Sequence, residues 1–236
     1  MLELALNRLE HLAEERYVHG TAAQVLGVDL CEFADWSRFQ AIFEDLPADQ
    51  YMNDGGTYRQ RRFGRFKYFL EGDRLECQPH GPYSQPKYFN PLNGGIERHF
   101  APLTDAIIGN NVLRTLLATL GRNYGELEQQ ASWRINTYFN RIIAQRDQVG
   151  KPVPEGMHRD GVKFSCLFMA NKINFSGGET TLFDILTHRP VFHGQLRSGG
   201  DMMVFRDDTV LHDTTSILPE DESRPGYRDV LVIEFR

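Results

Sequence analysis

Two short segments hold the side chains best suited to bind a metal ion. His158 and Asp160 lie two residues apart in Gly-Met-His-Arg-Asp-Gly, and His212 follows much further along the chain. In an extended segment residues i and i+2 project from the same face, so His158 and Asp160 can reach one ion. Two imidazoles and one carboxylate on one face of an octahedral ion leave three positions open, which is the arrangement used for non-haem iron(II) oxygen chemistry.

The segments around these residues favour a metal site over unrelated histidines. A lone His-x-Asp pair arises easily by chance. Here, however, the apolar run 164–170 follows the pair, and the run 200–205 leads towards His212. Zinc hydrolases also use two histidines and one carboxylate, but their usual helical His-Glu-x-x-His motif is absent from the chain. Four further histidines have no partner at ligand spacing, and we expect them to be structural or surface residues. They are His80, His99, His188 and His193.

The first half of the chain reads mainly as helices. Apolar side chains recur at spacings of three and four residues, and they predict helices over 2–19, 31–46 and 104–121. Alternating aromatic and basic residues predict a strand within 57–70. Four prolines and four glycines over 72–95 indicate a long ordered loop or a lid.

Short apolar runs dominate the second half. They are separated by Gly, Pro, Asn and Asp clusters, and they cover 133–143, 164–170, 180–183, 202–205 and 230–235. This pattern predicts an α+β fold in which a β-sandwich or β-barrel follows N-terminal helices. We expect one domain over 1–236, with about 1–125 rich in helix and about 130–236 forming the β-core that carries the metal site.

Bulk composition limits the partners. The chain has 236 residues, 41% of them hydrophobic, and a formal charge of −6, so it lacks the Lys/Arg surplus that binding to nucleic acid or an anionic membrane requires. No apolar run approaches the roughly 18 residues of a membrane span. Three cysteines without CxxC spacing suit neither a disulfide framework nor a structural zinc site. We expect a cytoplasmic protein with a small-molecule substrate.

Several sequence blocks carry a resemblance to a known family. They are Tyr-Arg-Gln-Arg-Arg-Phe-Gly-Arg-Phe (58–66), Gly94-Gly95, Pro-Glu-Gly-Met-His-Arg-Asp-Gly (154–161), Gly-Gly-Glu-Thr (177–180), His212 and Gly-Tyr-Arg-Asp-Val (226–230). In these blocks the chain resembles the 2-oxoglutarate and Fe(II)-dependent dioxygenases, in particular the bacterial branch with free L-isoleucine and L-leucine hydroxylases.

The resemblance implies a fold and a chemistry. The fold would be a double-stranded β-helix, a jelly-roll or cupin-like core with the N-terminal helices packed against it. Fe(II) would be held by His158, Asp160 and His212, with no further catalytic residue, and chelated by 2-oxoglutarate. O2 would convert 2-oxoglutarate to succinate and carbon dioxide while the substrate is oxidised. Halogenation is disfavoured because halogenases of this superfamily have Gly or Ala where this chain has Asp160.

The distal carboxylate of 2-oxoglutarate would need a buried cation, and a planar guanidinium can grip a carboxylate through two parallel bonds. Arg228 opens the last apolar run, so the strand would fix its direction. Arg224 has a spacing from His212 nearer to that of many superfamily members. It lies beside Pro225 in an acidic loop, however, where a solvated ion pair is expected. We therefore favour Arg228.

Substrate contacts are expected from the strand before the metal motif and from the motif itself. Asn136, Tyr138 and Arg141 lie on or beside this strand, where jelly-roll strands often wall the pocket, and Glu155 could receive an ammonium group. A basic cluster could hold a substrate carboxylate, although each member alone is expected to be solvated. Its members are Arg59, Arg61, Arg62, Arg65 and Lys67.

These expectations favour a hydroxylase of a small free L-amino acid, with aliphatic ones such as isoleucine or leucine preferred. One alternative keeps the chemistry but acts on another small metabolite. The alternative from another class is a cupin-like metal-binding protein without oxygenase activity. This alternative would not explain why an arginine stands at position 228.

Overall fold

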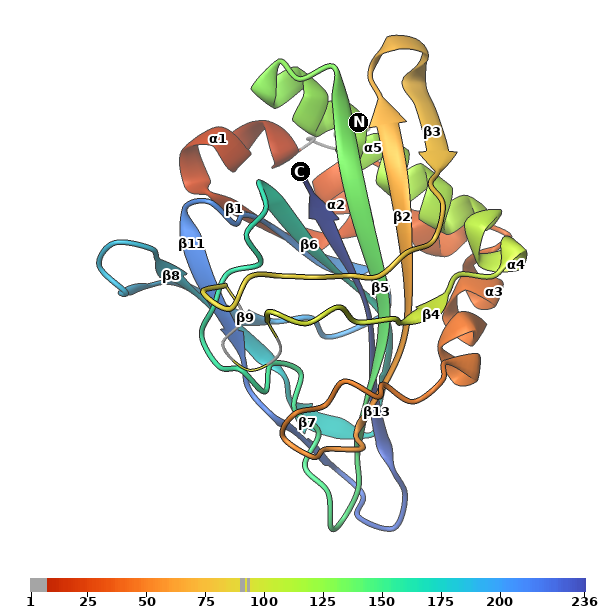
Figure 1. The fold of residues 1–236 in the computed structure, drawn as a ribbon, viewed down its shortest axis with the longest axis vertical. Helices are drawn as coiled ribbons and strands as arrows, with labels where there is room; N and C mark the ends of the chain where they lie inside the picture. Colours follow the sequence, from red (N-terminus) through yellow and green to blue (C-terminus); the bar gives the residue numbers. More distant parts are fainter. Residues whose placement is uncertain (1–7, 90–91, 93) are drawn as a thin grey trace, which may run out of the picture.

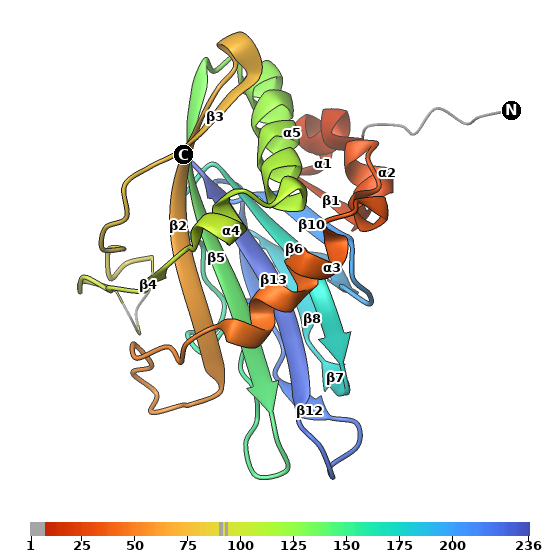
Figure 2. The same ribbon diagram turned by 90° about the vertical axis from the view of Figure 1, so that its right-hand side faces the viewer.

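Two groups of strands face each other across a cavity, and helices cover the outer face of the larger sheet (Figures 1 and 2). The computed structural model describes residues 8–89, 92 and 94–236. The predicted helix over 2–19 therefore lies partly outside the described residues.

The main sheet has eight strands in the order β1-β10-β6-β13-β5-β2-β3, with β4 pairing with β2. All its pairs are antiparallel except β2 with β4. Along the chain these strands are β1 (Tyr17–Thr21), β2 (Arg59–Phe69), β3 (Arg74–Cys77), β4 (Ala101–Pro102), β5 (Ser132–Ala144), β6 (Phe164–Ile173), β10 (Asp201–Arg206) and β13 (Gly226–Phe235).

Two smaller sheets form the opposite wall, with strand orders β11-β8-β9 and β12-β7. Their strands are β7 (Phe175–Gly177), β8 (Glu179–Asp184), β9 (Pro190–Gln195), β11 (Val210–Thr214) and β12 (Ile217–Pro219). An antiparallel bridge between His158 and His212 adds the metal-binding segment beside β11. The larger and smaller sheets together form the two walls of a jelly roll.

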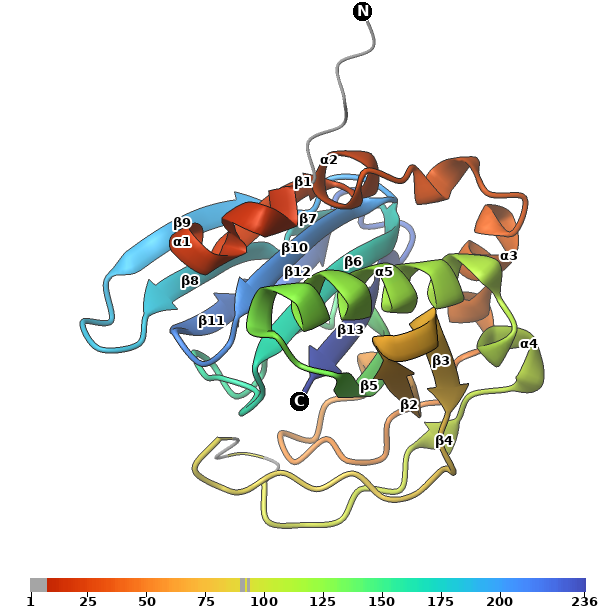
Figure 3. The same ribbon diagram turned by 90° about the horizontal axis from the view of Figure 1, so that it is seen from above.

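The helices pack on the main sheet (Figures 2 and 3). They are α1 (Leu12–Glu15), α2 (Ala22–Leu26), α3 (Trp36–Ala41), α4 (Asp105–Ile108) and α5 (Asn111–Glu128), with 3-10 turns at Arg8–His11, Leu30–Glu32, Ile42–Asp45 and Glu71–Asp73. Phe39 of α3 and Leu117 of α5 are fully buried in one cluster with Phe139 and Ile233 of the sheet. Among the described residues, every helix is too short or too polar to cross a membrane.

The structure confirms the predicted α+β class, with its jelly-roll core and packed helices, and each expected strand of the second half is present. The first half contributes more strand than predicted. Residues 17–19 belong to β1 rather than to a helix, because Arg16 takes a left-handed conformation (φ 65°) and Val18 then pairs with Val204 of β10. The expected loop over 72–95 also contains β3.

Two helix predictions had wrong boundaries. The segment 31–46 forms 3-10 turns on either side of a short α3. The segment 104–121 divides into α4 and α5, and Asn110 caps α5 by accepting hydrogen bonds from the N–H groups of Val112 and Leu113. Gly121 does not end this helix. A Cβ there would lie 2.6 Å from the ring of Tyr68, so the glycine permits close packing of α5 on the sheet.

Candidate active site

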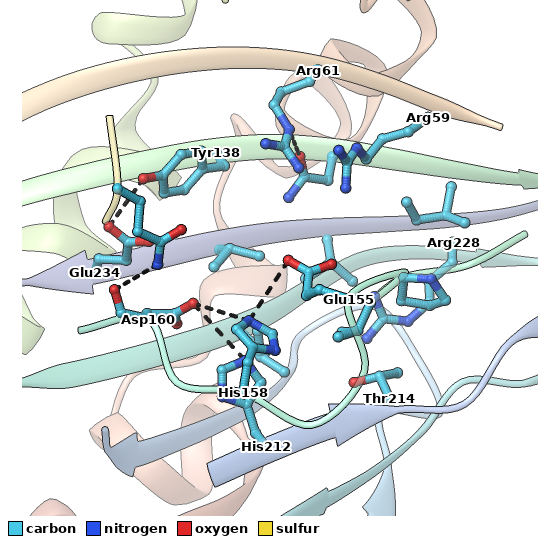
Figure 4. Close-up of a pocket in the computed structure, with 18 of the residues that line it drawn as sticks. Arg59, Arg61, Tyr138, Glu155, His158, Asp160, His212, Thr214, Arg228 and Glu234 are labelled. Atoms are coloured by element: carbon cyan, nitrogen blue, oxygen red, sulfur yellow. Dashed lines mark hydrogen bonds and ion pairs between the residues drawn. The ribbon is translucent and has the colours of Figure 1, made fainter. Parts of the chain in front are cut away.

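The structure brings His158, Asp160 and His212 together at one end of the cavity (Figure 4). One ligand atom from each residue lies within 4.8 Å of the other two. Nε2 of His158 is 3.5 Å and Nε2 of His212 is 4.0 Å from Oδ1 of Asp160. Ligands on one face of an octahedral ion lie roughly 3 Å apart, so small side-chain movements would let all three bind one ion.

Backbone pairing places the two imidazoles side by side. The N–H of His158 donates to the carbonyl of His212 at 3.0 Å, and the reverse bond measures 2.8 Å. The ring centroids are 4.3 Å apart. Nδ1 of His158 donates to the carbonyl of Gly156 at 2.9 Å, which fixes the tautomer that leaves Nε2 to bind a metal.

Asp160 is held by a buried carboxylate behind it. Asp207 has no exposed surface, and it accepts hydrogen bonds from the backbone N–H groups of Asp160 and Gly161 at 2.8 Å and of Val162 at 3.0 Å. The hydroxyl of Ser165 donates to Oδ2 of Asp160 at 2.7 Å and so orients the carboxylate. Both contacts preorganise a ligand without using its Oδ1 atom.

Electrostatics in the triad favour a positive charge. Burial opposes the charged form of His158, but its hydrogen bond to Asp160 and the nearby carboxylates raise its pKa to about 9. Burial and the charge of His158 lower the pKa of His212 to about 4. Burial alone would raise the pKa of Asp160, yet the histidines hold it well below its usual range. A divalent cation among these groups would replace the proton on His158.

Arg228 lies in the same cavity as the triad and is 5% exposed. Its Nε has no hydrogen-bond partner among the described residues. Burial lowers its pKa to about 10, so the side chain remains charged at neutral pH. The backbone of Gly178 lies beside this side chain, since a Cβ there would be in ordinary van der Waals contact with Nε at 3.4 Å. Thr214 also lines the cavity (Figure 4). A buried guanidinium with an unpaired donor fits the distal carboxylate of a dianionic ligand.

Arg224 occupies a different environment. Its side chain is 68% exposed, and its Nε lies 3.2 Å from the carboxylate of Asp221. This is the solvated ion pair that the acidic loop predicted, and the residue does not line the cavity.

Of the four expected substrate contacts, two line the cavity and two do not. Tyr138 and Glu155 line the cavity, whereas Asn136 is outside its lining and donates to Glu234 at 2.9 Å. The expectation for Arg141 is corrected by the structure. Successive residues of β5 face opposite sides of the sheet, so Arg141 points away from the cavity and forms two hydrogen bonds with Asp229, at 2.7 and 2.8 Å.

The basic cluster also divides. Arg59 and Arg61 line the cavity, contrary to the expectation of solvated side chains. Arg62 and Arg65 instead donate to the backbone carbonyls of Pro102 and Pro79. The alternation of the strand could have indicated that Arg59 and Arg61 share a face, but not which face.

Other residues of the site carried no signal in the sequence. Gln85 and Arg98 come from the segment between β3 and β4, and both line the cavity. Nε2 of Gln85 donates to the carbonyl of Asp160 at 2.8 Å. Glu234 lines the cavity from the last strand and accepts a hydrogen bond from the hydroxyl of Tyr138 at 3.0 Å.

A jelly roll with two histidines and one carboxylate at one end of its cavity defines the class of non-haem iron oxygenases. The sequence profile of the 2OG-Fe dioxygenase family matches residues 40–234, and the chain belongs to this family. It is therefore a 2-oxoglutarate-dependent non-haem iron dioxygenase that uses Fe(II), 2-oxoglutarate and O2. The triad and the buried Arg228, whose Nε has no hydrogen-bond partner in the part of the chain that the structure describes, fit these groups.

Relatives agree with this assignment. The chain is 28% identical over 200 residues to 3(1)-hydroxy-L-isoleucine 4-dioxygenase of Pantoea ananatis (strain AJ13355), covering 82% of this chain and 78% of the relative. A bsmA homolog from Methylobium petroleophilum PM1 superposes with a TM-score of 0.86 at 32% identity, covering 98% of this chain and 92% of that one. IDO from Bacillus thuringiensis shares the fold, with a TM-score of 0.77 at 14% identity and coverage of 98% and 94%.

The triad predicts a shared loss of iron binding. We expect His158→Ala, Asp160→Ala and His212→Ala each to abolish iron-dependent succinate formation while the protein stays folded, because its apolar core does not include the metal. Iron content after anaerobic loading and circular dichroism would measure both effects. His193→Ala is the matched control, since this exposed histidine contacts Thr181 outside the cavity. Full activity in any triad variant would contradict the assignment.

Asp207 predicts a second effect, on the loop behind the triad. Asp207→Asn loses at least one acceptor for buried N–H groups, so we expect the free energy of unfolding to fall by about 1–3 kcal/mol. Iron affinity should fall roughly 10–100-fold, as is usual when support for a metal ligand is removed. Chemical denaturation and anaerobic iron titration would measure the two. Asp208→Asn is the neighbouring control, because Asp208 pairs with Lys163 at 2.9 Å and is 31% exposed. Equal iron affinity in both variants would refute the role of Asp207.

Proposed function

We propose that this dioxygenase hydroxylates a small free L-amino acid, with aliphatic ones such as isoleucine or leucine preferred. The observation that carries the proposal is the mixed charge of the cavity. Arginines on β2 lie across the cavity from the triad, and Glu155 lies between them (Figure 4). A zwitterion needs both an acceptor for its ammonium and a donor for its carboxylate. The Pantoea relative, whose name gives a hydroxy-L-isoleucine as its substrate, supports the same class.

The residues of the chain have separate roles in this proposal. His158, Asp160 and His212 hold Fe(II), which with 2-oxoglutarate supplies the activation of O2 that ends in succinate, carbon dioxide and an oxidised substrate. Arg228 binds the distal carboxylate of 2-oxoglutarate, and the hydroxyl of Thr214 lies on the same side of the cavity. These contacts would fix the co-substrate before the amino acid binds.

The remaining lining suits an amino acid. Glu155 would accept the ammonium group, and the ring of Tyr138 would form part of the wall. An aliphatic side chain would find apolar partners in a set that comprises Ile142, Pro152, Val153, Leu167, Val230 and Val232. We also propose the cytoplasm as the compartment, which suits three cysteines that are all free.

A substrate screen tests the proposal directly. The purified enzyme with Fe(II), 2-oxoglutarate and O2 would be incubated with each free L-amino acid. Mass spectrometry would then follow succinate and a product that is heavier than the substrate by one oxygen atom, roughly 16 Da. We expect substrate-dependent succinate with one or more aliphatic amino acids. Turnover only with metabolites that are not amino acids would contradict the substrate class and leave the chemistry intact.

Arg228 predicts a specific defect in co-substrate binding. Truncating one partner of a buried charge pair typically costs on the order of 2–5 kcal/mol, so Arg228→Ala should raise the apparent KM for 2-oxoglutarate by at least about 30-fold. Arg228→Lys should recover only part of this, because an ammonium cannot reproduce the planar fork. Initial rates at varied 2-oxoglutarate would give both values.

Arg224→Ala is the internal control for Arg228 and should change the constant little, since its side chain is exposed and paired. If instead Arg224→Ala raises the KM for 2-oxoglutarate and Arg228→Ala does not, Arg224 would be the residue that binds the distal carboxylate. No effect from either variant would remove both arginines from the co-substrate site.

A further inference from the structure

Three guanidinium groups line the cavity besides that of Arg228. Arg59 and Arg61 come from β2, and Arg98 comes from the segment before β4. Arg59 and Arg61 lie across the cavity from His158 and His212 (Figure 4). Their pairing within the protein decides which of them are available to a ligand.

Arg59 is neutralised by the protein itself. Its Nε donates to the carboxylate of Asp49 at 2.8 Å, and the two side chains are 4% and 0% exposed. Arg61 lies 3.6 Å from the same carboxylate and donates from Nε to the amide oxygen of Asn140 at 2.7 Å. One buried carboxylate therefore serves two arginines, of which Arg59 is buried and Arg61 is largely buried. Burial, with the charge of Arg59, lowers the pKa of Arg61 to about 10, so it is still charged at neutral pH.

Arg98 has no ion pair with any residue that the structure describes. It is 3% exposed, and its Nε and one terminal nitrogen have no hydrogen-bond partner among the described residues. Its position is nevertheless fixed. Its backbone exchanges hydrogen bonds with Tyr83 at 2.8 and 2.9 Å, and its guanidinium lies 4.8 Å from the centre of the Tyr83 ring.

Arg61 and Arg98 meet at one aromatic ring. Their guanidinium carbons lie 4.8 and 5.6 Å from the centre of Phe100. The two like charges beside one ring, with side chains largely removed from water, repel each other and lose hydration, and the charge of Arg98 contributes to the lowered pKa of Arg61. An anion in the cavity would remove both costs, and a carboxylate matches the planar fork of a guanidinium.

We propose that Arg61 and Arg98 together bind the carboxylate of the substrate, so that a free carboxylate is required for turnover. The inference rests on the proposed amino-acid substrate and adds a requirement for substrate specificity. An amide or ester keeps the side chain of the substrate but loses the negative charge that compensates the positive charges of the two arginines. Amino acids joined through their carboxyl group to a peptide or a carrier are therefore excluded.

The test compares acids with their amides in matched variants. Succinate formation would be measured with each free L-amino acid, its C-terminal amide and related carboxylic acids without an amino group. Arg98→Met should raise the KM of the best acid by at least about 30-fold and change kcat little, because the contact serves binding rather than the reacting atoms. Arg98→Lys should recover part of the loss. The wild-type enzyme should reject the amides, and Arg98→Met, which keeps only Arg61, should distinguish acid from amide less sharply.

Arg62→Met is the matched control, since Arg62 lies on the same strand but donates to the carbonyl of Pro102 at 2.9 Å, outside the cavity. Iron content after anaerobic loading, measured in every variant, would show whether the iron site is intact. If the best substrate is a carboxylic acid without an amino group and Arg98→Met still raises its KM, the anchor stands while the amino-acid proposal fails. A KM within about threefold of wild type in Arg98→Met, or amides used as well as acids, would overturn the anchor. The anchor would also be overturned if neither the acids nor the amides bind to the enzyme, that is, if neither raises its Tm.

Discussion

The two-residue alternation of β5 and β13 is the constraint on which the rest of the structure depends. On β13, Leu231 and Ile233 pack under the helices, while Arg228 and Glu234 face the cavity. On β5, Phe139 packs under the helices and Tyr138 faces the cavity. One pair of adjacent strands therefore supplies both the apolar core and the polar wall of the site. If either strand slipped by one residue, its apolar side chains would face the cavity and its polar side chains would face the helices, so both the core and the site would be lost.

The metal-binding residues depend on this frame indirectly. They lie on the opposite wall, where the bridge between His158 and His212 fixes the imidazoles and Asp207 fixes the backbone of Asp160. A jelly roll can hold such ligands without the metal, because apolar clusters under the helices and between the sheets hold the fold together. This separation gives the site its rigidity, since its ligands are placed by backbone pairing rather than by the ion.

The triad and Arg228 were accessible to sequence analysis because their chemistry is unusual for their positions. A His-x-Asp pair before an apolar run and an arginine at the start of the last apolar run both stand out locally. Arg98 and Asp207 gave no such signal. An arginine after a Pro- and Gly-rich segment and an aspartate in a turn both look solvated, and only the packing of distant strands buries them. The strand at 17–21 was missed for a similar reason, since pairing with β10 overrode a helical pattern.

The direction in which side chains point was the second feature that the sequence predicted poorly. Strand alternation alone places Tyr138 and Arg141 on opposite faces, and applying it would have removed Arg141 from the expected substrate contacts. It could not show that Arg59 and Arg61 face inward, because that depends on their pairing with Ile142 and Asn140 across the sheet. Charged residues in a strand are usually placed towards water, and here the polar cavity reverses that expectation.

We expect one cavity to hold iron on the triad and 2-oxoglutarate with its distal carboxylate at Arg228. The most direct test is anaerobic titration of the metal-free protein with Fe(II) and then 2-oxoglutarate, followed by visible absorption. We expect the weak charge-transfer band of a chelated keto acid in the wild-type protein and its absence in Asp160→Ala. Iron that binds to the wild-type protein but gives no band on saturation with 2-oxoglutarate would contradict this arrangement of the site.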